Sequence, residues 1–211
     1  MRLSDLIFDR CCRLCGCAVD EGVVCEQCDE YLKSIAKVRR RKMCFEGKEV
    51  EARYLFFYND EKVKKLLFSL KRISDRELFD YAASLYFRLV PEDFCGTVTN
   101  PPRRGLSIRS AGFDQVAEPC KIMCKANKDR LKYERILRRR GFSYEQKNLS
   151  SIDRKRNIKG KFRIKIKDIP NNILIVDDVV TTGSTALECA SVIMKANPDV
   201  NLEFAFLASR N

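Results

Sequence analysis

A continuous apolar run, two acidic residues and a hydroxyl-rich loop follow one another near the C-terminal end of the chain. Residues 173–176 read Ile-Leu-Ile-Val, which is typical of a strand buried on both faces. Asp177 and Asp178 come next, then the loop 181–185, and a helix is expected over 185–195. A strand buried on both faces needs helices on both sides of its sheet. This stretch therefore predicts an α/β fold.

The same stretch is suited to binding an anion. Ligands of open α/β sheets bind at the carboxyl ends of the strands, where this loop is expected. The backbone N–H groups at a helix start favour an anion, and Gly183 lets the backbone approach it closely. Asp177 and Asp178 could hold the two cis hydroxyls of a ribose or help to place a divalent cation.

The stretch closely resembles the phosphoribosyl-pyrophosphate (PRPP) signature of type I phosphoribosyltransferases. The resemblance implies that Asp177 and Asp178 form the catalytic pair and contact the ribose hydroxyls, with Mg²⁺ bound beside PRPP. An ordinary strand followed by a capped helix is the alternative, and it explains the paired acids and the loop less well. The resemblance places the phosphate of PRPP against Val179, Val180, Thr181, Thr182, Gly183, Ser184 and Thr185.

Alternating strands and helices are expected before this stretch and after it. Their order predicts a mostly parallel sheet flanked by helices, as in a type I phosphoribosyltransferase-like domain. Pro119 is expected to kink or break its helix. The expected strands cover 52–58, 94–99, 173–176 and 202–208, and the expected helices cover 60–70, 76–89, 113–125 and 185–195.

The charge of the chain is concentrated in one region. The net charge is +12, but residues 1–30 carry −4 and residues 121–167 carry +14. A short basic run also occupies 39–42. The excess of positive charge favours a polyanionic partner or ligand. The chain has no histidine, which excludes Ser-His-Asp triads, Cys-His pairs and His-ligated metals.

The cysteines near the N-terminus have the spacing of a metal site. Cys12, Cys15, Cys25 and Cys28 form C-x2-C-x9-C-x2-C, which predicts a small knuckle around one structural Zn²⁺. Redox-active or merely buried cysteines are the alternative. Cys11 and Cys17 flank the first pair and leave the choice of ligands open. We expect two parts, the zinc knuckle with its basic connector over 1–48 and the phosphoribosyltransferase-like domain over 49–211.

Three further blocks resemble the competence protein F (ComF) family. They are Leu66–Lys71, Pro101–Gln115, and Leu137–Gln146 with its continuation to Phe162. Ala111 stands where the family usually has arginine, and Asp114 replaces its usual asparagine, so we expect weaker stabilisation of a pyrophosphate leaving group. The resemblance implies that the pyrophosphate and mobile-loop contacts include Lys71, Arg103, Arg104, Arg109, Gln146, Arg154 and Asn157.

The sequence therefore indicates a PRPP-binding protein similar to the ComF family. We expect it to bind PRPP or a related phosphosugar and to transfer the phosphoribosyl group, with Mg²⁺, to an unknown acceptor. Departure of pyrophosphate needs positioning and cations more than protein acid–base chemistry. The family resemblance also implies a link to DNA uptake and to proteins of the competence machinery.

The alternative is a competence factor without catalysis. It would bind single-stranded DNA and use the phosphate loop as a sensor of its ligand. No run of about 18 apolar residues is present, so no membrane span is expected. The first ten residues lack the pattern of a signal peptide, and we expect a cytoplasmic protein.

Overall fold

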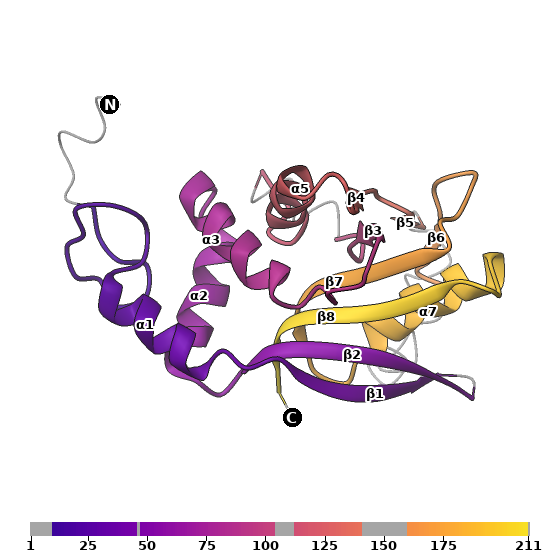
Figure 1. The fold of residues 1–211 in the computed structure, drawn as a ribbon, viewed down its shortest axis with the longest axis horizontal. Helices are drawn as coiled ribbons and strands as arrows, with labels where there is room; N and C mark the ends of the chain where they lie inside the picture. The colour runs from indigo at the N-terminus through magenta and orange to yellow at the C-terminus, as the bar shows by residue number, and fades with distance from the viewer. Residues whose placement is uncertain (1–9, 46, 104–111, 141–159, 211) are drawn as a thin grey trace, which may run out of the picture.

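The computed structural model describes residues 10–45, 47–103, 112–140 and 160–210. Its main sheet has the strand order β1-β2-β8-β7-β3-β4 (Figure 1). The last five strands of this order are parallel, and β1 is an antiparallel edge strand. The strands are β1 (Arg39–Phe45), β2 (Lys48–Phe57), β3 (Gly96–Thr99), β4 (Leu131–Tyr133), β7 (Asn172–Val180) and β8 (Asn201–Ser209), while β5 (Leu137–Arg139) and β6 (Phe162–Ile164) form a separate two-stranded ribbon.

The central strands are buried on both faces, as their composition predicts. Along β7, Ile173 and Ile175 point into one apolar core, and Leu174 and Val176 point into the other. Side chains alternate along a strand, so an uninterrupted apolar run needs a cover on each side. The α/β class and the mostly parallel sheet flanked by helices are confirmed.

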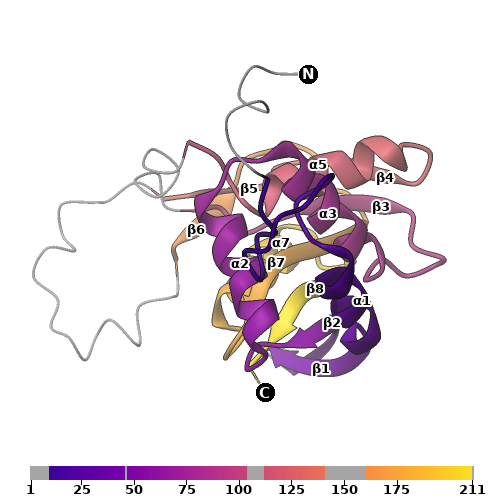
Figure 2. The ribbon, with the colours of Figure 1, turned by 90° about the vertical axis from the view of Figure 1, so that its left-hand side faces the viewer.

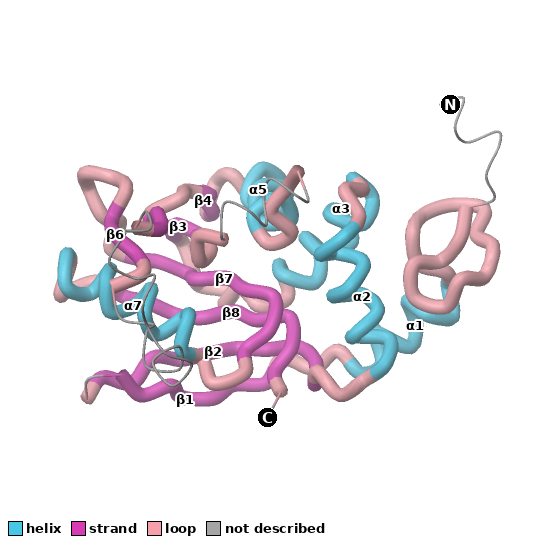
Figure 3. Tube along the Cα trace, turned by 180° about the vertical axis from the view of Figure 1, so that it is seen from behind, coloured by secondary structure: helices cyan, strands magenta, loops and turns pink. Residues whose placement is uncertain are grey.

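Helices cover both faces of this sheet. The core on one face holds side chains of α2 (Glu61–Arg72), α3 (Arg76–Phe87) and α5 (Ala117–Ala126). On the other face, α7 (Ser184–Ala196) and the β5–β6 ribbon share the second core with β7 and β8. Seen from behind in Figure 3, α7 lies in front of the strands.

The N-terminal cysteine segment packs against α2 and α3. It leads into α1 (Glu26–Ile35), and Figure 2 views the molecule from this side. Arg13 donates a hydrogen bond to Asp75 over 3.2 Å, and its backbone carbonyl accepts one from Ser69 over 3.3 Å. The buried Cys12 and Leu14 belong to the same core as α2 and α3. The knuckle thus rests on the helix that carries Lys71.

Local polar groups explain where several elements begin. Asp60 accepts a hydrogen bond from the Val63 N–H and caps α2. The Asp114 carboxylate accepts hydrogen bonds from Val116 N–H and Ala117 N–H, so α5 begins at Ala117 rather than at residue 113. Pro119 therefore falls in the first turn, where a proline is tolerated, and the expected break is wrong.

Two further differences from the expected elements affect the site. The basic residues 39–42, expected in a connector, lie in β1 at the edge of the main sheet. Strand β7 runs on to Val180, so Asp177 and Asp178 lie inside the strand rather than after it. Within the described residues, none of the helices has both the length and the apolar character that crossing a membrane requires.

Candidate functional site

The loop between β7 and α7 has the geometry expected of an anion-binding loop. Gly183 adopts the left-handed φ of 74°, and the helix begins at Ser184. The Thr182 and Ser184 hydroxyls lie 3.0 Å apart. The N-cap residue Gly183 has no side chain to cap α7, and in the described residues the Ser184 N–H donates to the Thr182 hydroxyl over 3.4 Å. Thr181, Thr182 and Thr185 are exposed, which leaves this loop accessible to a ligand.

The two acidic side chains at the end of β7 differ in their surroundings. Asp178 Oδ2 lies 3.1 Å from Lys71 Nζ and accepts a hydrogen bond from Gln115 Nε2 over 2.9 Å. No described residue places a cation at hydrogen-bond distance from Asp177. Burial, with the nearby charge of Asp178, raises the pKa of Asp177 to about 8. The pair therefore has one carboxylate held by a lysine and one whose charge is disfavoured.

A cavity of about 270 Å³ opens at this end of the sheet. It is bounded by the ends of β3 and β7 and by the starts of α5 and α7, and the last turn of α2 reaches it. The carboxyl ends of β3 and β7 meet here because these strands are parallel neighbours. The lining residues are Lys71, Asn100, Pro101, Pro102, Arg103, Gln115, Val116, Arg139, Asp177, Asp178 and Thr185.

Two polar atoms of this cavity have no partner in the described part of the chain. Gln115 is 4% exposed, and its Oε1 atom is buried without a hydrogen bond. Arg103 Nη1 is likewise buried without an acceptor. Buried polar atoms are normally satisfied by a hydrogen-bond partner, and at this cavity a ligand or an ordered water would supply it. One is an acceptor and the other a cationic donor, which fits a ligand with both hydroxyls and negative charge.

A second cavity of about 250 Å³ shares four lining residues with the first. It lies at the base of the β5–β6 ribbon and is strongly basic, with Asp114 as its acidic lining residue. The shared lining includes Arg103 and Arg139, so positive charge continues from one cavity into the other. The lining residues are Asn100, Pro102, Arg103, Asp114, Arg135, Leu137, Arg138, Arg139 and Lys165.

The structure brings five of the predicted ligand contacts to one cavity. Lys71, Arg103, the acidic pair and Thr185 line this cavity. The other described members of the predicted phosphate loop do not line it; they are Val179, Val180, Thr181, Thr182, Gly183 and Ser184. Arg104, Arg109, Gln146, Arg154 and Asn157 lie outside the described residues.

Sequence reasoning missed three polar residues of the cavity lining. Gln115 ends the Pro101–Gln115 block, so its signal was present in the sequence. Arg139 belongs to the basic middle, and its Nε donates to the Pro102 carbonyl over 2.7 Å. Asn100 carries no sequence signal, because only the pairing of β3 with β7 brings it to the site.

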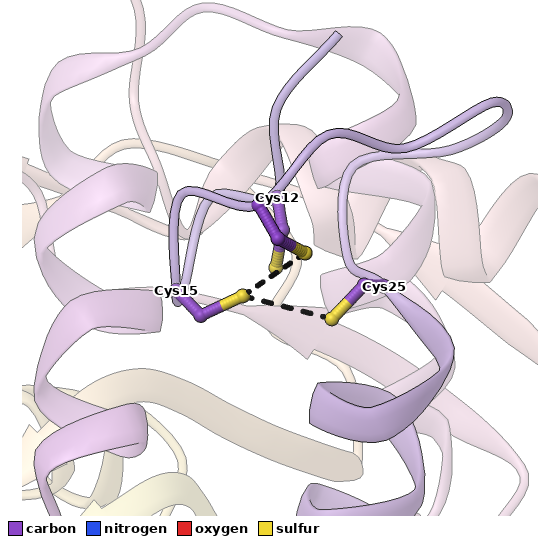
Figure 4. Close-up of side chains that lie close together, drawn as sticks. Cys12, Cys15 and Cys25 are labelled. Carbon is purple, nitrogen blue, oxygen red and sulfur yellow. Dashed lines mark hydrogen bonds between the residues drawn. The ribbon is translucent and has the colours of Figure 1, made fainter.

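Four cysteine thiols form a separate group in the knuckle (Figure 4). The sulfurs of Cys12, Cys15, Cys17 and Cys25 all lie within 4.8 Å of one another. The Cys15 and Cys25 sulfurs are 3.7 Å apart, close to the spacing of about 3.8 Å between ligands of tetrahedral zinc. This group could hold a metal ion such as zinc.

The ligand set of this group differs from the predicted one. Cys17 is in the group, while the predicted Cys28 is not. Cys28 interacts with Cys25 and Cys15. Its burial and these interactions raise the pKa of its thiol to about 12. The Cys17 backbone N–H, with neighbouring thiols, lowers the pKa of Cys15 to about 6. Cys15 is therefore prepared as a thiolate, the form that binds metals.

Comparisons with known proteins agree with the sequence motifs. No family model matches the chain. It is 37% identical over 84 residues to DNA utilization protein YhgH of Escherichia coli O6:H1, covering 40% of this chain and 37% of that protein. It is 36% identical over 63 residues to Competence protein F of Haemophilus influenzae, covering 28% of each. The matched segments span about a third of these curated relatives.

One solved structure aligns with most of the chain at low similarity. Orotate phosphoribosyltransferase from Aeropyrum pernix aligns with a TM-score of 0.38 and 17% identity, covering 86% of this chain and 81% of that one. The similarity to the two sequence relatives confirms the resemblance that the motifs indicated. Over these segments the chain is similar to Competence protein F and to DNA utilization protein YhgH.

Proposed function

We propose that this protein binds PRPP or a related phosphosugar in the cavity at the end of β7. The main observation is that one cavity joins the paired acids, the start of α7, and two buried polar atoms without partners. These groups match the parts of a phosphosugar, because N–H and hydroxyl donors suit a phosphate, and carboxylates suit sugar hydroxyls.

Each part of the ligand has a proposed place. The 5′-phosphate would lie on the loop from Thr181 to Thr185, and the ribose hydroxyls would donate to Asp177 and Asp178. The pyrophosphate would lie toward Arg103 and the basic second cavity, where an anion is stabilised most strongly. Lys71 is paired with Asp178 and can turn toward a ligand phosphate when the sugar occupies the carboxylate.

Transfer of the phosphoribosyl group is the enzymatic form of this proposal. The bond between C1 and the pyrophosphate oxygen breaks, and pyrophosphate leaves with the electron pair. A lone pair of the acceptor forms the new bond to C1, and the acceptor then loses its proton to solvent. Mg²⁺ bound with the substrate would neutralise charge on the leaving group. Arg103 and Arg139 supply positive charge from the protein itself.

Calorimetry followed by an assay of pyrophosphate release tests this proposal. The protein is titrated with PRPP and Mg²⁺, and we expect saturable binding of one ligand per chain. Release of pyrophosphate is then measured with a panel of bases and amines. Turnover would establish a transferase, and binding without turnover would favour a ligand sensor. Absence of PRPP binding would refute both forms.

A second candidate function, binding of single-stranded DNA, is favoured by three exposed aromatic rings that each lie against a cation. Phe68 on α2 is 57% exposed, and the Arg72 guanidinium lies 4.5 Å from its ring centre. Similar pairs join Lys62 to Tyr31 and Arg39 to Phe57. Exposed rings interleaved with cations are typical of proteins that stack bases and hold a phosphate backbone. The names of the sequence relatives are consistent with such a role.

We expect Phe68→Ala to weaken binding of an oligo-dT strand about fivefold or more, because it removes a stacking platform. Fluorescence anisotropy with a labelled strand measures the effect. Phe87→Ala is the matched control, since Phe87 is also an exposed helical phenylalanine (38%) but lies on α3. The parent affinity should also fall steeply with added salt. Equal affinities of the two variants for the strand would refute the role of Phe68 as a stacking platform.

A further inference from the structure

Arg41 lies on the edge strand β1, which β2 and β8 separate from β7, but its side chain reaches toward the end of β7 where the phosphate loop starts. Its Nη1 lies 3.3 Å from the Ser209 hydroxyl and donates to it. Ser209 pairs with Val180, the last residue of β7 before the loop. Although Arg41 is far from the loop in sequence, its guanidinium is therefore close to the start of the loop.

Met43 provides a second connection between Arg41 and the loop. Arg41 Nη2 lies 4.0 Å from the Met43 sulfur. The Met43 methyl group lies only 2.1 Å from where a Cβ atom on Gly183 would be. Because Gly183 has no side chain, Met43 can reach the loop. Met43 therefore contacts both the loop and Arg41. Arg41 and Met43 share one face of β1 because side chains alternate along a strand.

The charge of Arg41 is not compensated by the described part of the chain. Its neighbours Arg40 and Lys42 pair with Glu51 and Glu49. Arg41 is half-buried and forms no ion pair with any described residue, and its Nε atom is buried without a hydrogen bond. A partly desolvated cation without a partner is costly, so an anion nearby would stabilise it.

We propose that Arg41 is a positive counter-charge for the 5′-phosphate of the bound sugar. This inference rests on the proposed function and adds a residue from a different strand to the phosphate site. Arg41 acts on binding only, since it lies on the phosphate side of the ligand and away from the C1 atom where bonds would change. Its contribution should therefore appear only with ligands that carry a 5′-phosphate.

Calorimetry with three ligands, PRPP, ribose 5-phosphate and inorganic pyrophosphate, tests this role. We expect Arg41→Gln to weaken binding of the first two about tenfold and to leave pyrophosphate binding unchanged. A charge-assisted interaction of this kind typically has this magnitude. Arg40→Gln is the matched control, because Arg40 is the neighbouring arginine on the opposite face of β1. Arg41→Lys, which keeps the charge, should bind nearly as the parent does.

The outcomes separate this inference from the proposed function. If the parent binds PRPP and Arg41→Gln binds all three ligands as the parent does, the role of Arg41 is refuted and the proposed function stands. If Arg41→Gln weakens all three ligands equally, or Arg41→Lys is as weak as Arg41→Gln, the effect is structural and the inference is also refuted. If the parent binds neither PRPP nor ribose 5-phosphate, the proposed function fails first. Thermal unfolding of each variant shows whether it is folded.

Discussion

Replacing both Asp177 and Asp178 with asparagine should weaken PRPP binding by at least about a hundredfold. At a pH above the Asp177 pKa of about 8, both side chains are carboxylates, and each is expected to accept a charge-assisted hydrogen bond from a ribose hydroxyl, worth about 1.5–3 kcal/mol. Asparagine keeps the size of the side chain and removes its charge. Calorimetry in the presence of Mg²⁺ measures the loss. Binding equal to that of the parent would show that the ligand does not use this pair.

The same pair gives a stability signature that is independent of any ligand. The pKa of Asp177 is raised to about 8, so between about pH 4 and 8 the folded chain holds a proton that the unfolded chain has lost. Stability should therefore fall as the pH rises through this range. Asp177→Asn carries no ionisable group, and its melting temperature should exceed that of the parent by several degrees at pH 8.

This comparison also controls for misfolding. At pH 5 the parent aspartate remains largely protonated when folded, so the two proteins should melt at more similar temperatures than at pH 8. A stable variant that no longer binds PRPP would show that this carboxylate is kept for the ligand at the expense of stability. A variant less stable than the parent at pH 8 would contradict the raised pKa.

Loss of a single central thiolate should release zinc and unfold the knuckle. A segment this short has little core of its own, and structural zinc typically contributes about 10–16 kcal/mol of binding energy to such a fold. We expect the purified parent to hold one zinc per chain and Cys25→Ser to hold none. Elemental analysis measures the metal content. Cys44→Ser is the control, because Cys44 is exposed on β1 and outside the group.

Two more variants decide the fourth ligand. The group in the structure contains Cys17, whereas the sequence spacing favours Cys28. If the group is the metal site as it stands, Cys17→Ser should lower the zinc content and Cys28→Ser should retain it. The reverse pattern would restore the spacing-based assignment. A parent protein without zinc, with its N-terminal segment folded, would refute the metal site altogether.

The sequence was most informative where one residue pattern had one structural solution. An apolar run ending in two acids and a loop predicted β7, α7 and the cavity beyond them, because burial on both faces leaves few other arrangements. It was least informative where distant segments meet. The hydrogen bond from Gln115 to Asp178 joins residues 63 positions apart, and no local pattern reports it.

The short elements could not be predicted from the sequence either. Strands β4, β5 and β6 have three residues each, too few to show a period. The basic run in β1 looked like a connector because its composition is polar, although its place at the sheet edge exposes part of it to solvent. Cysteine spacing located the thiol group, but side-chain direction decides which four sulfurs converge.

The contact between the knuckle and α2 gives a physical route by which metal binding would affect the cavity. The Arg13 carbonyl accepts from Ser69, two residues before the Lys71 that reaches the cavity. If zinc binding orders this helix, it would also favour binding at the proposed sugar site. The coupling free energy would be the same in the other direction, from sugar binding to zinc binding. Zinc saturation should tighten the Kd for PRPP, and PRPP should slow the loss of zinc to a chelator. The availability of zinc would then change the affinity of this protein for a sugar phosphate.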